Sequence, residues 1–455
     1  MSLTVYAPLG MLGYGFPVAS LEAAVDRRPD VFAMDAGSTD PGPYYLGSGH
    51  SYTSREMVRR DLSLLLPAAR RLGVPLIVGS AGGSGGKPHL DRTVEIVREV
   101  AAAQGLTFRM AVIKAEIPQD TLLAALRAGR IHDFEVGRQL EEDDLTACER
   151  IVGQMGVEPV MEALHGGADV IIAGRAFDAA LAAALPLIQG HDPGLSFHMG
   201  KIVECGSLVA LPRTSDGVLA HMEDGSFVIE PADPLKRSTV ELVAAHTLYE
   251  KSDPYRLGMP GGIIDLRDCR FEQVDERSVR VSGSRFVASP QYTIKLEGVA
   301  IAGYRSVCIA GARDPILIRQ FDEVMQGATT KVRADLQGRI DPNDYQLRYR
   351  LYGRDGVMGE LEPSPPQEPQ ELGVVMEVIA RTQEIADTVG ALLRSATLHI
   401  GYSGRMATAG NLAFPYSPAE FPAPPAYEFR VYHLLDVDDP LALFPISYES
   451  VEGQS

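Results

Sequence analysis

The chain has 455 residues, of which 45% are hydrophobic and 22% are charged, and its formal net charge is −18. This composition excludes an intrinsically disordered chain, and the length allows two or three domains. The negative charge argues against a nucleic-acid partner, because affinity for a phosphate backbone comes from clustered lysine and arginine.

No apolar run approaches the length of a membrane span, and the first twenty residues lack the pattern of a signal peptide. We therefore expect a cytoplasmic protein without a membrane partner. The cysteines, at 148, 205, 269 and 308, form no CxxC pair and no zinc spacing. A disulfide framework and a metal site are therefore not predicted. We also predict no cofactor, since no complete nucleotide-binding motif is present.

In residues 1–195, short apolar segments alternate with segments of helical periodicity. The predicted strands are Thr4–Leu9, Val31–Met34, Val74–Val78, Thr107–Ile113, a segment near Ile131–Val136, and Asp169–Ala173. The predicted helices are Ser20–Arg27, Arg55–Leu72, Leu90–Gln104, Gln119–Ala128, Leu145–Leu164 and Ala176–Ile188. This alternation predicts an α/β ligand-binding domain with a mostly parallel sheet. An open, doubly wound sheet is favoured over a closed barrel, which usually needs eight such units.

From residue 196 to residue 360 the pattern is that of a second, β-rich α+β domain. The stretch VLAHMEDGSFVIEP predicts a hairpin closed by Asp224 and Gly225. Further helices are predicted at Pro315–Gln326 and Leu372–Arg394. The prolines of residues 361–372 argue against regular structure there. Residues 373–455 are expected to form a helix and C-terminal strands that pack on the preceding domains.

The stretch LIVGSAGGSGGKP joins the strand before residue 79 to the helix from Leu90. Backbone N–H groups at the start of a helix favour anions, and glycine lets the backbone approach a ligand closely. Gly82, Gly83, Ser84, Gly85 and Lys87 are therefore candidates for binding a carboxylate or phosphate. The loop is not a Walker A motif, and a simple mobile turn remains the alternative interpretation.

Two other loops follow predicted parallel strands, whose carboxyl ends are where ligands bind in open α/β sheets. The loop after Met34 offers Asp35 and Ser38. The loop AGRAFDAAL offers Arg175, which could pair with a substrate carboxylate, and Asp178, which could hold that arginine or act as a base. A purely structural ion pair between Arg175 and Asp178 is the alternative.

The stretch KIVECGSLVALP places Glu204 and Cys205 within an apolar segment. Partial desolvation raises the pKa of a carboxyl group toward neutrality, as a general acid or base requires. Glu204 is therefore the main catalytic candidate. Cys205 could be a nucleophile if a neighbouring group lowered its pKa, although a buried inert thiol is the commoner case.

Several stretches together resemble the acyclic terpene utilisation (AtuA) family. They are LIVGSAGG, GADVIIAGRAFDAAL, GKIVECGSLVA, HMEDGSFVIE, AAHTLYEKSDPY and TAGNLAFPYSP. The family's GRxxD and ECG stretches correspond to Arg175 with Asp178 and to Glu204-Cys205-Gly206. The resemblance implies a catabolic enzyme that acts on branched or unsaturated acids or on their CoA thioesters.

The preferred hypothesis is a lyase, hydratase or isomerase, in which Glu204 moves a proton next to a carbonyl while the glycine loop and Arg175 fix an anionic group. The alternative is a non-catalytic, acyl-CoA-binding or scaffolding subunit of a larger catabolic complex. Hydrolysis by Cys205 is a third hypothesis. The expected partner is a small acid or an acyl-CoA, and the chain is expected to form a homo-oligomer.

Overall fold

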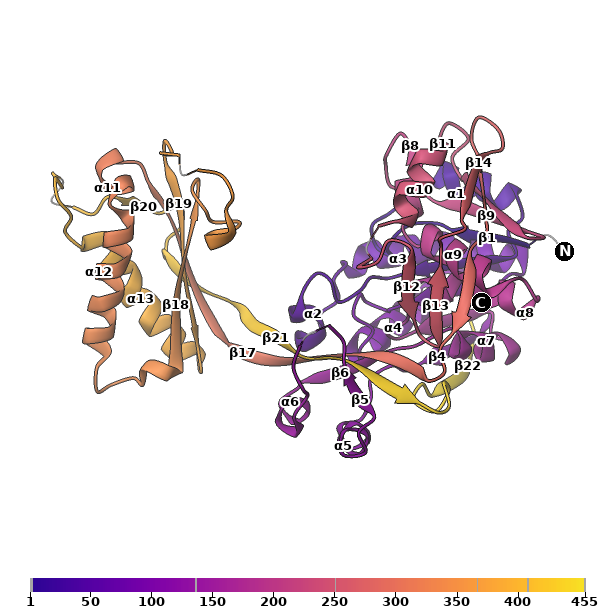
Figure 1. Ribbon diagram of the computed structural model, residues 1–455, viewed down its shortest axis with the longest axis horizontal. Coiled ribbons are helices and arrows are strands. Elements are labelled where there is room, and N and C mark those ends of the chain that lie inside the picture. The colour runs from indigo at the N-terminus through magenta and orange to yellow at the C-terminus, as the bar shows by residue number, and fades with distance from the viewer. Residues whose placement is uncertain (1–2, 136, 250, 366, 407–408, 454–455) are drawn as a thin grey trace. The chain divides into compact units, whose positions relative to one another are not determined.

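The computed structural model describes residues 3–135, 137–249, 251–365, 367–406 and 409–453. The chain forms two compact units (Figure 1). Residues 1–300 and 429–455 belong to the first unit, and residues 301–428 to the second. Both boundaries fall inside long strands, β17 (Tyr292–Ala312) and β21 (Glu420–Val437). None of the helices in the described residues has the length and apolar character that a membrane crossing requires.

The first unit is built on a large mixed sheet with a parallel centre, as the α/β class predicts. In spatial order the parallel strands are β1 (Leu3–Ala7), β2 (Val31–Asp35), β3 (Leu76–Gly79), β7 (Val170–Ala173) and β4 (Phe108–Ile113). Antiparallel strands extend both edges. Beyond β1 they are β9 (Val218–Glu223), β10 (Ser226–Pro231), β15 (Val279–Ser282) and β14 (Arg270–Gln273), and β22 (Ile446–Val451) pairs with β4.

The β9–β10 hairpin confirms the turn predicted at Asp224 and Gly225, where the glycine has a φ of 74°. Because β9 pairs with β1, the β-rich segment continues the parallel sheet. The boundary expected between residues 195 and 196 falls within α9 (Pro193–Val203), which follows α8 (Asp178–Ile188) inside the first unit.

Helices cover the two faces of this sheet because alternate residues of each parallel strand point to opposite sides. Tyr6 and Phe32 belong to one apolar cluster, with α1 (Val18–Asp26), α3 (Arg55–Leu72) and α4 (Lys87–Gln104). Val5 and Val31 belong to another, with α7 (Glu158–His165), α8 and α9. The apolar runs that predicted buried strands therefore contribute side chains to two separate hydrophobic cores, one on each face of the sheet.

Two predicted helices are wrong in part. The segment Leu145–Leu164 contains the end of α6 (Glu142–Thr146), then β6 (Arg150–Gln154) and α7. The β-branched pair Ile151 and Val152 lies in β6, which pairs with β17. The segment Leu372–Arg394 begins as β19 (Leu372–Ala380), and only then forms α13 (Gln383–His399). In both cases hydrogen-bonded pairing with β17 stabilises a strand where a helix was predicted.

The second unit has the order β-α-β-β-α-β, which is the split βαβ arrangement. Its elements are the second half of β17, α11 (Pro315–Arg319), α12 (Phe321–Leu336), β18 (Tyr345–Tyr352), β19, α13 and the first half of β21, and β20 (Leu412–Ala413) pairs with β17. The strands lie in the order β18-β19-β17-β21. Helices α12 and α13 pack on one sheet face through buried Phe321, Val324 and Leu393 (Figure 1).

The first unit also contains several shorter elements. They are α2 (Pro43–Ser48), α5 (Gln119–Arg127), β5 (Ile131–Asp133), β8 (Ala210–Leu211), β11 (Arg237–Ser238) and α10 (Val240–Thr247). A small antiparallel sheet consists of β12 (Arg256–Met259), β13 (Gly262–Asp265) and β16 (Arg285–Ala288). Between β18 and β19, a 3-10 turn (Gly359–Leu361) precedes proline-rich residues without regular structure, of which Pro366 lies outside the described residues.

Candidate functional site

A cavity of about 500 Å³ lies in the first unit, beyond the carboxyl ends of β2 and β7. This is the position and the size expected for a small-molecule site on an open α/β sheet. Its polar lining consists of Ser38, Asp40, Gln154, Arg175, Asp178, Lys201, Ser289, Thr293, Lys295 and Tyr432. Its apolar lining consists of Phe134, Phe177, Leu257, Met259, Pro260, Ile263 and Leu434. The cavity is therefore amphipathic.

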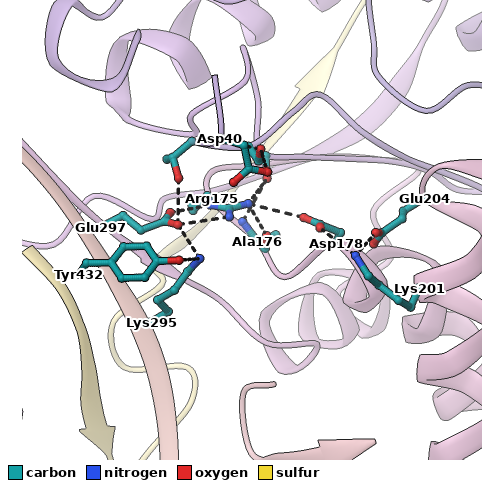
Figure 2. Close-up of polar contacts among 12 residues, drawn as sticks. Asp40, Arg175, Ala176, Asp178, Lys201, Glu204, Lys295, Glu297 and Tyr432 are labelled. Carbon is teal, nitrogen blue, oxygen red and sulfur yellow. Dashed lines mark hydrogen bonds and ion pairs between the residues drawn. The ribbon is translucent and has the colours of Figure 1, made fainter. Parts of the chain in front are cut away.

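Six side chains beside this cavity form a row of alternating charge, which we call the charge row (Figure 2). Each member lies within 4.0 Å of the next. In order they are Lys295, Glu297, Arg175, Asp178, Lys201 and Glu204. Strand β17 supplies the first two, the β7–α8 connection and α8 supply the middle two, and the end of α9 supplies the last two.

Arg175 is held inside the protein by Glu297. The guanidinium Nε donates to Glu297 Oε2 at 2.7 Å, and Nη1 donates to Ser80 Oγ at 3.3 Å and to the carbonyl oxygen of Ala176 at 3.0 Å. The other oxygen of Glu297 accepts from Thr39 Oγ1 at 3.0 Å and lies 2.7 Å from Lys295 Nζ. Protein groups thus occupy much of the donor capacity of Arg175 that the sequence analysis assigned to a substrate carboxylate.

The charge state of Glu297 follows from these partners. Burial is the largest influence and acts to raise its pKa, but Arg175 and Lys295 outweigh burial and lower the pKa to about 2. Glu297 and Asp178 both face Arg175. Burial acts to lower the pKa of the Arg175 guanidinium, but these two carboxylates outweigh burial and raise it. Glu297 and Arg175 are therefore both ionised at neutral pH.

Replacing Glu297 by alanine should lower the free energy of unfolding by about 3–5 kcal/mol, because it leaves the buried Arg175 and the partly buried Lys295 without their carboxylate. Glu142→Ala is the matched control, since it removes a carboxylate that pairs with Arg127 at the surface. Urea denaturation of both variants measures the difference. Equal losses of stability would contradict a dominant role for the buried pair.

Lys201 lies in the last turn of α9 and Glu204 is the C-cap residue of this helix, at the i and i+3 spacing that places two side chains on one helix face. Lys201 Nζ donates to Glu204 Oε1 and lies 4.0 Å from Asp178 Oδ2. Glu204 is 8% exposed, and its Oε2 has no hydrogen-bond partner within the described part of the chain. Glu204 therefore lies behind Lys201, which itself lines the cavity.

Two carboxyl groups at this end of the site have raised pKa values. Burial and then Asp178 raise the pKa of Glu204 well above its ordinary value, while Lys201 acts in the opposite direction. Burial and Asp178 likewise raise the pKa of Asp35, which ends β2, against the effect of Arg175. These groups hold protons at a pH at which Glu297 is ionised. For Glu204, the apolar residues around it in the sequence correctly predicted that its pKa is raised.

The raised pKa of Glu204 predicts a definite pH dependence of stability. Its contribution is complete below the unfolded value near 4.5 and is lost as the pH rises toward the folded value, because only the unfolded state has then released the proton. Glu204→Gln removes this loss. Relative to the wild type, the variant should therefore be more stable at pH 8 than at pH 5 in urea denaturation.

Glu142→Gln serves as the control for this measurement, because its hydrogen bond with Arg127 lowers the pKa of Glu142. The contribution of such a group is lost only as the pH falls, so its difference from the wild type should be constant between pH 5 and pH 8. A Glu204→Gln difference that is equally constant would show that Glu204 is ionised across this range.

The glycine loop is packed against its neighbours. Gly82, Gly83, Ser84 and Gly85 are buried, and a Cβ on Gly85 would lie 2.1 Å from the backbone nitrogen of Arg175. Lys87 Nζ lies 2.5 Å from Asp91 at the surface, and its backbone N–H donates to Glu116 Oε2 at 2.8 Å. Gly85 and Lys87 line a different cavity, of about 200 Å³.

Gly85→Ala should therefore be far more damaging than an ordinary glycine substitution. Its φ of 68° disfavours a Cβ, and the contact with Arg175 forces the backbone to move. The expected loss of unfolding free energy is at least about 3 kcal/mol. Gly105→Ala, with a φ of 63° and open space around it, should cost about 1–2 kcal/mol. Thermal unfolding of the two variants tests this contrast.

The remaining candidates are distributed around the site. Ser38 lines the cavity, and its Oγ donates to Asp40 Oδ2 at 2.7 Å. Cys205 is half-buried, its Cα lies near Gly10, and it is not among the residues that line the cavity. Among the described residues, no group of three or more His, Cys, Asp or Glu side chains has the arrangement of a metal site.

Lys201, Lys295 and Glu297 were not predicted as site residues from the sequence. A usable signal was present for the last two, because they are charged residues two positions apart in the otherwise apolar stretch TIKLEGVAIA. Charges at that spacing share one face of a strand. For Lys201, the signal was its position three residues before Glu204 in a segment that begins with the helix-starting pair Asp192-Pro193.

The fold and the site together define an α/β protein that holds a buried carboxyl group of raised pKa next to an amphipathic cavity. Residues 50–413 match the family model described as acyclic terpene utilisation family protein AtuA. The chain therefore belongs to the acyclic terpene utilisation family, and the matched range includes Arg175, Asp178 and Glu204. Searches of curated proteins and of solved structures gave no match.

Proposed function

We propose that the chain is a catabolic enzyme of the lyase, hydratase or isomerase type. Its substrate is a branched or unsaturated carboxylic acid or the CoA thioester of such an acid, and Glu204 is the general acid and base. The observation that carries the proposal is the buried Glu204 carboxyl group, which contacts the cavity-lining Lys201 and leaves one oxygen without a hydrogen-bond partner in the described chain.

The three reaction types share one chemical requirement. Each moves a proton on or off a carbon atom near a carbonyl group, which needs an acid or base whose pKa lies nearer neutrality than that of an ordinary carboxyl group. Glu204 meets this requirement through burial. Lys201 and Asp178 connect it to the cavity, and the Lys201 ammonium stabilises negative charge that develops on the substrate oxygen.

The cavity lining supports an amphipathic substrate. Leu257, Met259 and Ile263 come from the β12–β13 hairpin and offer an apolar surface to a branched chain. Lys201 and Lys295 offer local positive charge to the acid or thioester end. Such local cations are needed, because the net charge of −18 repels an anion at longer range.

Within this proposal Arg175 is a positioning residue. Its contacts with Glu297, Ser80 and Asp178 tie the carboxyl ends of β3 and β7 to β17. Asp178 is thereby oriented toward Lys201, from which it is separated by 4.0 Å. The substrate anion is assigned to the two lysines and to Ser38.

Glu204→Gln keeps the shape of the side chain and removes its acid–base function. Turnover of branched and unsaturated acids or their CoA thioesters should fall by about 10²–10⁴-fold, while binding persists. The exposed Glu56→Gln is the control, and it should retain wild-type rates. Substrate conversion is followed by mass spectrometry over a panel of such compounds.

Undiminished turnover by Glu204→Gln would refute its assignment as the acid and base. Binding of acyl-CoA without turnover by either protein would instead support the non-catalytic, acyl-CoA-binding subunit. Isolation of the native protein in a stable complex with another chain would strengthen that alternative.

A further inference from the structure

Lys201 and Lys295 both line the cavity, but they contact different kinds of carboxyl group. Lys295 Nζ lies 2.7 Å from Glu297, whose pKa is lowered to about 2, and 4.9 Å from the centroid of the Tyr432 ring. An ionised carboxylate and an aromatic face both stabilise an ammonium group. Lys201 instead contacts Glu204, whose pKa is raised well above its ordinary value. The positive charge of Lys201 is therefore less well compensated than that of Lys295.

Other basic groups lie close enough to Lys201 to repel its charge. Lys251 follows α10, and its Nζ donates to the carbonyl oxygen of Thr247. Burial and then the charge of Lys201 lower the pKa of Lys251 to about 8, and they lower the pKa of His246 to about 4. Because electrostatic repulsion is mutual, Lys251 also favours the loss of a proton from Lys201. A lysine next to a second cation is a known arrangement for a nucleophilic amine.

Lys201 also lies beside a carboxylate that is able to take its proton. Figure 2 shows its Nζ between Asp178 and Glu204. Asp178 Oδ2 is 4.0 Å away, and Asp178 Oδ1, 3.5 Å from Arg175 Nη1, has no hydrogen-bond partner within the described residues. A buried amine at a substrate cavity, with a second cation and a proton acceptor beside it, has the parts that covalent catalysis by lysine requires.

We propose that Lys201 forms an imine with the ketone carbonyl of an oxo acid bound in this cavity. Lys201 first binds the acid as an ammonium group and then passes one proton to Asp178. The neutral Nζ attacks the carbonyl carbon, one Nζ proton moves to the carbonyl oxygen, and this oxygen leaves as water with the proton that Asp178 returns. The product is a positively charged iminium group, and no oxidant or further reactant is needed.

The iminium group withdraws electrons from the neighbouring carbon, so a proton on that carbon is more acidic than in the unbound acid. Glu204, which contacts Lys201, is placed to move this proton. Lys295 and Ser38 remain to hold the carboxylate of the acid. This inference rests on the proposed function, and it narrows the substrate from branched or unsaturated acids in general to those that carry an oxo group.

Reduction with sodium borohydride tests the imine, because it converts the iminium group into a stable secondary amine. The wild type is incubated with pyruvate, acetoacetate or α-ketoisovalerate and then reduced. Its mass should rise by that of the acid less one oxygen atom, and peptide mass mapping should place the addition on Lys201. Lys201→Arg keeps a positive charge beside Asp178 and Glu204 and should lose the addition. Lys331→Met removes an exposed lysine that pairs with Asp335, and it should be labelled at Lys201 like the wild type.

Lys251→Met tests the origin of the neutral amine. Without the charge of Lys251, Lys201 holds its proton more strongly, so the pH of half-maximal labelling should rise by about one unit. An unchanged midpoint would contradict this account of the amine. Circular dichroism establishes that each variant is folded, and the peptide map of the wild type carries the test if Lys201→Arg is not.

The inference is overturned if none of the three acids labels Lys201 in the wild type, or if Lys201→Arg is labelled as strongly. Glu204→Gln should still form the imine, since Asp178 carries the proton in that step. Labelling of Lys201 without Glu204-dependent turnover would refute only the proposed function. Glu204-dependent turnover of acids that lack an oxo group, with no labelling of Lys201, would refute this inference alone.

Discussion

The buried carboxylate of Glu297 joins three parts of the chain that are far apart in sequence. It accepts from Arg175 after β7, from Thr39 in the loop after β2, and from Lys295 on its own strand. Each contact fixes a segment that lines the cavity. Because a buried charge is stable only when its partners are in place, the ion pair also selects one arrangement of these loops. The positions of Ser38, next to Thr39, and of Asp178, which faces Arg175, follow from it.

The charge row contains carboxyl groups with opposite behaviour because their surroundings differ. Glu297 faces two cations, and these lower its pKa despite complete burial. Glu204 contacts one cation and feels the negative charge of Asp178, so burial prevails and its pKa is raised. Two acids in one site whose environments separate their pKa values can take different roles. Glu297 is suited to a fixed structural charge, and Glu204 to exchanging a proton.

The sequence predicted the features that depend on local pattern. The apolar runs located the parallel strands, Asp224-Gly225 located a hairpin, and the loops at the carboxyl ends of β2 and β7 contained cavity residues. It failed where distant segments decide the outcome. Residues 150–154 and 372–380 are strands because β17 pairs with them, and no local window contains that information. Glu297 is likewise more than one hundred residues from Arg175, so its pairing could not be read from spacing.

The glycine loop shows how a pattern typical of anion binding also serves packing. Gly85 lies against the backbone of Arg175, and a Cβ on the adjacent Gly174 would lie 2.7 Å from the carbonyl oxygen of Gly85. The two turns interlock only because neither has a side chain at the contact. Ser80, in the same loop, then receives the guanidinium of Arg175. The glycines thus allow the loops after β3 and β7 to pack closely, so that Arg175 points inward at Glu297. They influence the cavity by positioning this arginine.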